Sequence, residues 1–240
     1  TIKACGYAIS KKGGYGGYLG KDVGSIDEAI RLIDDLNKKG VDYIKVINSG
    51  IVDLETGEIT AGGFEAGELK DLVSHAGALG LDVFCHANGD NAIRDAIVAG
   101  AKAIIHGFMI SDDSIGMMKE NNVIFIPTIA ALSRLKDILE SDEAVTIINR
   151  LVEDHLAAIK KAYDMGVKVL PGSDSGSRSL PYGLTFLEEL NLFHKAGLNI
   201  EEVLSVAVAG TIQIGQQADL VAIEGPPFEK GEILIAGRYR

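Results

Sequence analysis

The sequence predicts an α/β protein built on a parallel β-sheet, and two observations lead to that class. Short apolar runs alternate along the chain with segments whose apolar residues recur at the helical period, which is the pattern of βα units. Glycine follows the helical segments, as at Gly40, Gly80, Gly100 and Gly166, where it can end a helix in the left-handed conformation. With 240 residues, of which 47% are hydrophobic, the chain can bury a substantial core.

The first strand is expected at Ile2–Ile9, and the glycine-rich segment Lys11–Gly24 after it is expected to be a mobile loop. Ser25 and Glu28 form a capping box that begins the first helix. Ser49–Gly63 is expected to be irregular, with a hairpin at Thr56–Gly57. The helical period and its stop signals predict further helices at Phe64–Leu79, Asp90–Gly100, Ser114–Asn121, Glu143–Met165, Leu184–Ala196 and Ile200–Val208. Apolar runs predict the remaining strands, which begin at Tyr43, Val83, Ala103, Val123 and Val167.

The pattern changes beyond Gly210, where short strands separated by turns predict a small β appendage. These strands are expected at Ile212–Gly215, Ala218–Ile223 and Ile233–Gly237. The part before them holds six predicted parallel strands, whereas a closed (β/α)8 barrel needs eight. Either two strands precede Thr1 in the natural protein, or the sheet is open and the fold is doubly wound.

Composition excludes several classes of function. The formal net charge is −11 and the pI is near 4.9, which argues against nucleic acid or an anionic membrane as a partner, since both need basic surface. The chain holds no apolar run of the ~20 residues that span a bilayer and no signal-peptide pattern. We therefore expect a cytoplasmic protein that acts on a small molecule, with a homo-oligomer left open. Cys5 and Cys85 both fall in predicted buried strands, so reduced thiols are expected.

Four side chains that could carry chemistry lie at or near the C-terminal ends of different predicted strands: Lys45, His86, His106 and Asp174. Parallel-sheet enzymes keep their active sites at this edge of the sheet. Two imidazoles, a carboxylate and a lysine that could become a carbamate by reacting with carbon dioxide suit zinc or another divalent ion. The sequence therefore predicts a metal site of one or two ions.

Each of these residues also has an ordinary explanation. Either histidine could be a hydrogen-bonded core residue, and Asp174 could cap a glycine- and serine-rich turn. Lys45 could extend to solvent or act as a Schiff-base lysine. Their joint placement on strand ends favours a site. The other histidines, at positions 75, 155 and 194, lie in predicted helices beside polar neighbours and are expected on the surface.

Several segments resemble the amidohydrolase superfamily, in particular its imidazolonepropionase and Xaa-Pro or Xaa-Arg dipeptidase-like members. They are YIKVINSG, CHANGDNAI, AGAKAIIHG and GSDSG, found at Tyr43–Gly50, Cys85–Ile93, Ala99–Gly107 and Gly172–Gly176. The tail Gly210–Gly225, GTIQIGQQADLVAIEG, is similar to the return from the barrel to a β-sandwich. The resemblance implies an incomplete (β/α)8 barrel, strands three to eight, over residues 1–209, with part of a β-sandwich at 210–240.

The resemblance also implies roles. Lys45 would be the carboxylated lysine that bridges two metals, and His86 and His106 would bind the second metal. Asp174 would bind the first metal and serve as the catalytic general base and then acid. Tyr15 stands where related dipeptidases have a loop histidine, so a substrate-binding role would pass to it.

The sequence departs from the family in ways that bear on activity. It holds no His-x-His pair, which the family carries on its first strand. The connection Val206–Gly210 is also shorter than in relatives. We therefore expect segments before Thr1 and near Val208 to be missing, and little hydrolase activity if the 240 residues are the whole molecule.

These observations predict a metal-dependent hydrolase of amide, cyclic amide or dipeptide-like C–N bonds. Two alternatives stay open. One is a (β/α)8 lyase that uses Lys45 as a Schiff base, and the other is a non-catalytic barrel fragment that binds a partner through its open sheet edge.

Overall fold

A parallel sheet of six strands forms the centre of the computed structural model, which describes residues 2–177, 179–208, 220–223 and 235–239. The strand order is β2-β1-β3-β4-β5-β6. The strands are β1 (Ala8–Lys11), β2 (Gly20–Val23), β3 (Ile44–Ile47), β4 (Val83–Ala87), β5 (Ala103–His106) and β6 (Ile124–Ile126). Within the described residues the sheet is open, because β2 and β6 do not pair with each other.

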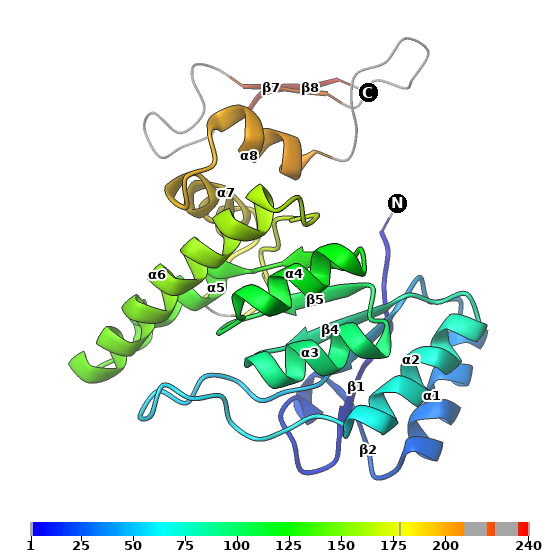
Figure 1. Ribbon diagram of the computed structural model, residues 1–240. Helices are drawn as coiled ribbons and strands as arrows, with labels where there is room; N and C mark the ends of the chain where they lie inside the picture. Colours follow the sequence, from blue (N-terminus) through cyan, green and yellow to red (C-terminus); the bar gives the residue numbers. More distant parts are fainter. Residues whose placement is uncertain (1, 178, 209–219, 224–234, 240) are drawn as a thin grey trace.

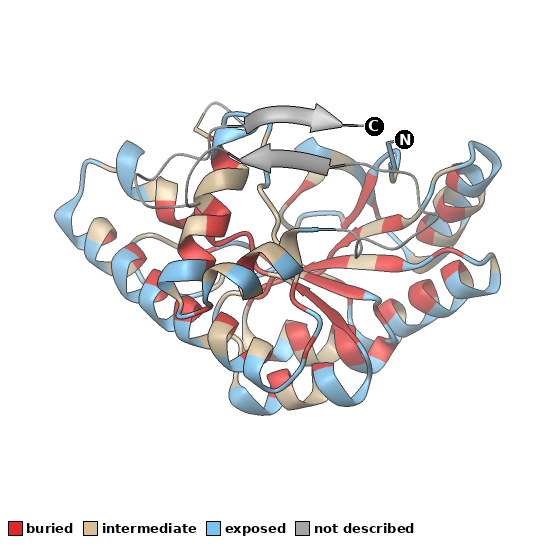
Figure 2. Cartoon of the chain, turned by 90° about the horizontal axis from the view of Figure 1, so that it is seen from above, coloured by how far each residue is buried: buried red, intermediate tan, exposed pale blue. Residues whose placement is uncertain are grey.

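Helices follow the strands, and the first four of those described cover one face of the sheet. They are α1 (Ile26–Lys38), α2 (Ala66–Ala78), α3 (Asp90–Ala99), α4 (Asp112–Glu120), α5 (Ile129–Arg134), α6 (Asp142–Asp164), α7 (Leu184–Lys195) and α8 (Ile200–Ala207), with short 3-10 turns at Gly17–Leu19 and Leu135–Ile138. Figure 1 shows α2, α3 and α4 side by side in front of the strands, and Figure 2 shows that the helices turn their buried residues toward the sheet. None of the described helices is both long and apolar enough to cross a membrane.

The hydrophobic core lies between these helices and every second residue of the strands. Val46 of β3, Cys85 of β4 and Ile104 of β5 are fully buried in it, and they are neighbours in the sheet register. Because successive side chains of a strand point to opposite faces, Lys45 and His86 project from the other face. The core therefore leaves the chemistry-bearing side chains on the side of the sheet away from the helices.

The N-terminal part of the chain differs from the prediction. The first strand begins at Ala8 rather than Ile2, whose side chain is 89% exposed, and Cys5 lies before the strand with only partial burial. The predicted mobile loop contains strand β2, which pairs in parallel with β1. Gly20 makes this pairing feasible, since a Cβ there would clash with the carbonyl oxygen of Ala8.

Other elements match the prediction more closely. The Ser25 side chain accepts a hydrogen bond from the Glu28 amide at the start of α1, and Val52 forms an antiparallel bridge with Ile59 across the predicted hairpin. The strand predicted from Val167 is reduced to a parallel bridge between Phe125 and Val169. Helix α5 was not predicted. Beyond residue 208, β7 (Leu220–Ile223) pairs antiparallel with β8 (Ile235–Tyr239), and the expected strand at Ile212–Gly215 lies outside the described residues.

Candidate active site

The predicted site residues gather at the C-terminal edge of the sheet. His86 is the fourth residue of β4, and His106 is the last residue of β5. Asp174 follows the segment that pairs through Val169 with β6. Lys45 lies one residue into β3, on the same face as His86 but nearer the middle of the strand. The parallel arrangement thus places residues that are up to 129 positions apart in the sequence around one part of the sheet.

The two imidazoles are in direct contact. Their ring centroids are 4.5 Å apart and the ring planes meet at 74°. Strand alternation alone would direct His106 toward the helices, like Ile104 two residues earlier. His106 instead has a φ of 71°, and this left-handed backbone turns its side chain toward His86. The pattern of the sequence does not reveal that turn.

His86 is held by the loop that follows β3. Its Nε2 lies 3.0 Å from the carbonyl oxygen of Gly50 and 3.3 Å from Nδ2 of Asn88. A carbonyl can only accept, so the shorter contact favours a proton on Nε2 and leaves the Nδ1 lone pair available. Burial lowers the pKa of His86 to about 4. The hydrogen bond to Gly50 opposes this shift, whereas the positive charge of Lys45 lowers the pKa further. His86 is therefore neutral at pH 7, which is the form that binds metals.

His106 is held by Thr128, which lies just after β6. The His106 Nδ1 is 2.6 Å from the Thr128 hydroxyl, and no hydrogen-bond partner for Nε2 occurs in the described part of the chain. Burial, followed by the charges of His86 and Lys45, holds the pKa of His106 well below its usual range. Both imidazoles thus offer one nitrogen each, Nδ1 of His86 and Nε2 of His106.

Lys45 and Asp174 influence each other electrostatically. Burial lowers the pKa of Lys45 to about 8, while Cys85 and Asp174 oppose the shift. Burial raises the pKa of Asp174, and the Lys45 ammonium opposes that shift. A low ammonium pKa increases the neutral amine fraction near physiological pH, which is the form that can act as a nucleophile or form a carbamate.

Tyr15 lies over His86 on the open side of the site. The two rings are stacked, with centroids 5.4 Å apart and planes at 30°. The Tyr18 hydroxyl donates to the Tyr15 hydroxyl at 2.6 Å. Burial raises the pKa of Tyr15, and the Tyr18 hydrogen bond and the Asp174 charge raise it further. Tyr15 therefore stays a neutral phenol beside both His86 and Asp174, where it could contact a substrate.

The donor set around the two histidines is incomplete for a divalent ion. Among the described residues, no three His, Cys, Asp or Glu side chains are grouped closely enough to hold one. Two neutral imidazoles nevertheless converge with one available nitrogen each, and Lys45 and Asp174 lie close enough to shift each other's pKa. The pair of neutral imidazoles is compatible with one side of a metal site, and the charge of Lys45 acts on both of them.

The prediction for His155 was wrong. This residue of α6 is buried, and its ring contacts Phe108 and Phe125 at centroid distances of 4.9 and 5.7 Å. Its spacing from Leu151 and Ile159, four residues on either side, would have placed it on the core face of the helix. Of the other two predicted surface histidines, His194 is exposed and His75 is partly buried; His75 bonds Asp34 at 2.7 Å, and His194 bonds the Leu198 carbonyl at 2.8 Å.

The sequence analysis missed two residues that contact the site, Asn88 and Thr128, and one buried acid, Glu189. Asn88 joins the loops after β3 and β4, because its amide donates to the Ser49 hydroxyl at 2.8 Å. Thr128 holds His106, and Glu189 is a fully buried acid on α7. Because Asn88 comes two residues after His86, the sequence could have indicated that the Asn88 side chain lies near the site. The role of Thr128 depends on the unexpected turn of His106.

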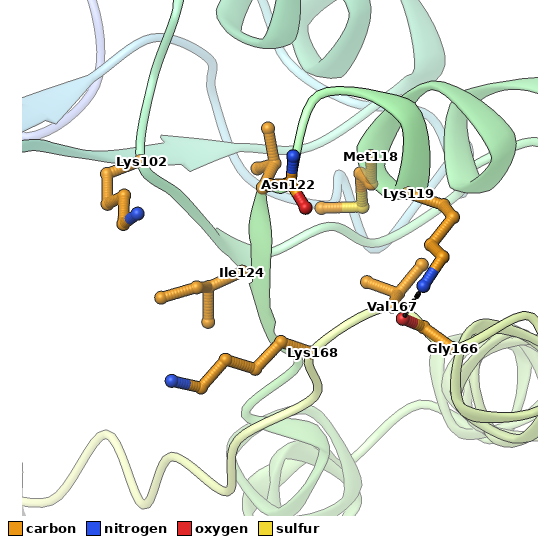
Figure 3. A pocket seen from close by; sticks show the side chains of 9 residues that line it. Lys102, Met118, Lys119, Asn122, Ile124, Gly166, Val167 and Lys168 are labelled. Atoms are coloured by element: carbon orange, nitrogen blue, oxygen red, sulfur yellow. Dashed lines mark hydrogen bonds between the residues drawn. The ribbon is translucent and has the colours of Figure 1, made fainter.

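A separate hollow of about 240 Å³ lies at the opposite, N-terminal edge of the sheet. Figure 3 shows that several of its lining side chains come from the starts of strands and the ends of helices. The lining residues are Lys102, Met118, Lys119, Asn122, Val123, Ile124, Gly166, Val167 and Lys168. It shares no residue with the histidine pair, so it is not part of the candidate site.

Comparison with solved structures confirms the predicted fold. A crystal structure of a Xaa-Pro dipeptidase with methionine bound in its active site is 24% identical, with a TM-score of 0.73 over 88% of this chain and 57% of that one. The A. niger ochratoxinase structure is 22% identical, with a TM-score of 0.81 over 96% of this chain and 61% of that one. At these identities the likeness shows the fold, an incomplete barrel of the type expected.

Sequence comparison gives the family. The uncharacterized protein Rv2915c of Mycobacterium tuberculosis (strain ATCC 25618 / H37Rv) is 26% identical over 174 residues, and the uncharacterized protein Mb2939c of Mycobacterium bovis matches equally. The match covers 71% of this chain and 46% of either relative, so the chain spans about half the length of the curated relatives it matches. The model of the amidohydrolase family matches residues 4–236. The chain therefore belongs to the amidohydrolase family.

Proposed function

We propose that this chain carries part of the active site of a metal-dependent hydrolase that cleaves C–N bonds of small amides, cyclic amides or dipeptide-like molecules. The observation that carries the proposal is the contact between His86 and His106, two neutral imidazoles held by Gly50 and Thr128. Family membership supports the reaction class. The likeness to a Xaa-Pro dipeptidase supports the dipeptide-like substrate.

His86 and His106 would hold a divalent ion, zinc in the first instance, with Lys45 and Asp174 as further ligands. The chemistry that such an ion supplies when bound is Lewis acidity, which acidifies water and polarises a scissile carbonyl. Lys45, with its pKa near 8, can add carbon dioxide as the neutral amine. The ammonium first loses one proton, and the addition then forms an N–C bond and releases a second proton, so that the lysine carries an anionic carboxylate in place of its positive charge.

Asp174 would move the protons of the reaction. Its carboxylate would take a proton from the attacking water and pass one to the leaving nitrogen. Burial raises its pKa, which makes it a stronger base than a solvated carboxylate. Tyr15, stacked on His86 and near Asp174, would orient the substrate above them.

An activity assay on the intact gene product incubated with zinc chloride and bicarbonate tests this proposal. Asp174→Asn should lower hydrolysis of Xaa-Pro dipeptides or N-acyl amino acids by about 10²-fold or more, the usual contribution of a general base. Asp154→Asn, at an exposed position of α6, serves as the matched control and should leave the rate unchanged. Equal loss in both variants, or undiminished hydrolysis by Asp174→Asn, would contradict the role of Asp174.

The Schiff-base alternative is favoured by one observation, the lowered pKa of Lys45. A neutral lysine amine could attack a substrate carbonyl and lose water to form an imine. Borohydride reduction in the presence of aldehyde or keto-acid probes, followed by mass spectrometry, distinguishes the two functions. A reduced adduct at Lys45 would support the lyase, whereas zinc-dependent hydrolysis without an adduct would support the hydrolase.

A further inference from the structure

Asn88 is a buried polar residue to which the proposed chemistry gives no role. It follows β4 directly and is 2% exposed. Its Oδ1 accepts a hydrogen bond from the backbone amide of Phe108 at 3.1 Å, and its Nδ2 donates to the carbonyl oxygen of Gly50 at 3.3 Å. Gly50 lies in the loop after β3, and Phe108 lies in the loop after β5. One side chain therefore joins the loops that follow three neighbouring strands.

The partners of Asn88 set the orientation of its side-chain amide. The backbone N–H of Phe108 can only donate, so it requires the amide oxygen of Asn88. The amide nitrogen must then face Gly50 and His86. The Nε2 of His86 lies 3.0 Å from the Gly50 oxygen and 3.3 Å from Nδ2 of Asn88. With a proton on Nε2, both nitrogens donate to the same carbonyl oxygen, so Asn88 holds the acceptor that sets the tautomer of His86.

The bond to Phe108 supports the turn that brings His106 to the site. His106 and Met109 have positive φ, at 71° and 62°, a conformation that persists only where the surroundings enforce it. Phe108 lies between them, with its amide bonded to Asn88 and its carbonyl oxygen accepting the amide of Gly89 at 2.8 Å. Its ring lies against His106, with the ring centroids 5.6 Å apart. A displacement of Asn88 would thus reach His106 through Phe108.

We propose that Asn88 is a positioning residue, which fixes His86 and His106 relative to each other through the Gly50 carbonyl on one side and the Phe108 amide on the other. Its purpose rests on the proposed hydrolase function. The contrasting explanation is a residue that only satisfies backbone groups of buried loops. That explanation accounts for the bonds to Gly50 and Phe108, but not for the approach of Nδ2 to the His86 ring or for the acceptor that the two side chains share.

Imidazole NMR, hydrogen exchange and titration with zinc chloride, all on the intact gene product, separate the two roles. Asn88→Ala removes both side-chain bonds, so the nitrogen chemical shifts of His86 and His106 should change. The Phe108 amide should exchange about 10-fold faster, as expected for the loss of one hydrogen bond. Zinc should bind about 10-fold more weakly, the lower end of the losses that follow removal of an outer-shell partner.

Two further variants complete the test. Asn121→Ala is the matched control, because it loses a side-chain amide bond to the carbonyl oxygen of Met117 at an exposed helix end, and it should alter none of these quantities. Asn88→Asp keeps an oxygen that can accept from Phe108, so the Phe108 amide should exchange as slowly as in the unmodified protein. Release of that amide by aspartate as well as by alanine would contradict the bond through Oδ1.

The outcomes discriminate between the roles. A lower unfolding temperature of Asn88→Ala with unchanged shifts of His86 and His106 would establish a purely stabilising residue and overturn the proposal. If the variants do not fold, the unmodified protein still decides, because a proton on Nδ1 of His86, or a Phe108 amide that exchanges as fast as an open loop, would contradict the positioning role. Shift and exchange changes without any zinc binding by the unmodified protein would support the positioning role and refute the proposed function. Equal zinc affinity with unresponsive imidazoles would do the reverse.

Discussion

At the scale of single residues, the candidate site depends on backbone conformations that residues other than glycine rarely adopt. His106, Thr128 and Asp174 all have positive φ, at 71°, 48° and 49°. Each such residue costs on the order of 1–3 kcal/mol and persists only where the surroundings enforce it. All three follow or end neighbouring strands, so the strain is concentrated at the edge where His86 and His106 meet. The neighbours of these residues should therefore control the geometry of the site.

Thr128→Val tests this control at His106. Valine keeps the branched shape of threonine but removes the hydroxyl that lies 2.6 Å from Nδ1 of His106. We expect zinc affinity to fall about 10-fold, as for other lost outer-shell partners, and the His106 nitrogen shifts to move. Calorimetric titration with zinc measures the first effect. Thr146→Val, on an exposed turn of α6, is the control, and equal affinity in both variants would show that Thr128 does not orient His106.

At the scale of elements, Asp90 joins the starts of α3 and α4. Its Oδ1 accepts the Ser111 amide at 3.0 Å and the Ser114 hydroxyl at 2.6 Å, and its Oδ2 accepts Nε of Arg94 at 2.7 Å. Burial acts to raise the pKa of Asp90, but the hydrogen bonds from Ser114, Arg94 and Ser111 outweigh it and hold this pKa well below its usual range. The ionised carboxylate therefore stabilises the helical layer behind β4 and β5.

Asp90→Asn should lower the free energy of unfolding at pH 7 by about 1–3 kcal/mol, because asparagine replaces a charged acceptor of several bonds. The folded pKa of Asp90 is depressed, so its stabilising effect is complete above the unfolded pKa of about 3.9 and is lost progressively as the pH falls from there through the lower folded pKa. Urea unfolding at pH 7 and pH 3 measures both values. The difference between the variant and the unmodified chain should begin to shrink by pH 3, and a difference that stays constant with pH would contradict this assignment. Asp95→Asn on the same helix should change stability by less than about 0.5 kcal/mol at either pH.

At the scale of the whole molecule, the sequence predicts those parts whose signals are local. Strand β4, helix α3 and strand β5 were expected from apolar runs with a glycine stop at Gly100, and they form within one or two residues of the expected bounds. The cap at Ser25 and a hairpin at Thr56–Gly57 were predicted for the same reason, and the structure has the cap and a bridge between Val52 and Ile59 around that turn. Lys45, His86 and Asp174 could be placed at the sheet edge because parallel strands end together.

What the sequence could not predict depends on tertiary packing. Strand β2 has the polar sequence GKDV and lies at the edge of the sheet, so it lacks the apolar pattern of a buried strand. His106 turns toward His86 because its backbone leaves the extended conformation of a strand, and the spacing of apolar residues in the sequence does not predict this change. The hydrogen bond between His106 and Thr128 and the hydrogen bond between Glu189 and Ala130 join residues that are far apart in the sequence. The division at residue 209 into barrel and sandwich parts stays a prediction.

The central claim is that His86 and His106 hold a divalent ion at the C-terminal edge of the sheet. An anomalous difference map at the zinc absorption edge, from crystals of the full chain grown with zinc chloride, tests it most directly. The account predicts a peak about 2.0–2.1 Å from both Nδ1 of His86 and Nε2 of His106, the usual length of a zinc–nitrogen bond, with Lys45 or Asp174 beside it. The absence of a peak between the two imidazoles at saturating zinc, or zinc bound only elsewhere on the chain, would contradict it.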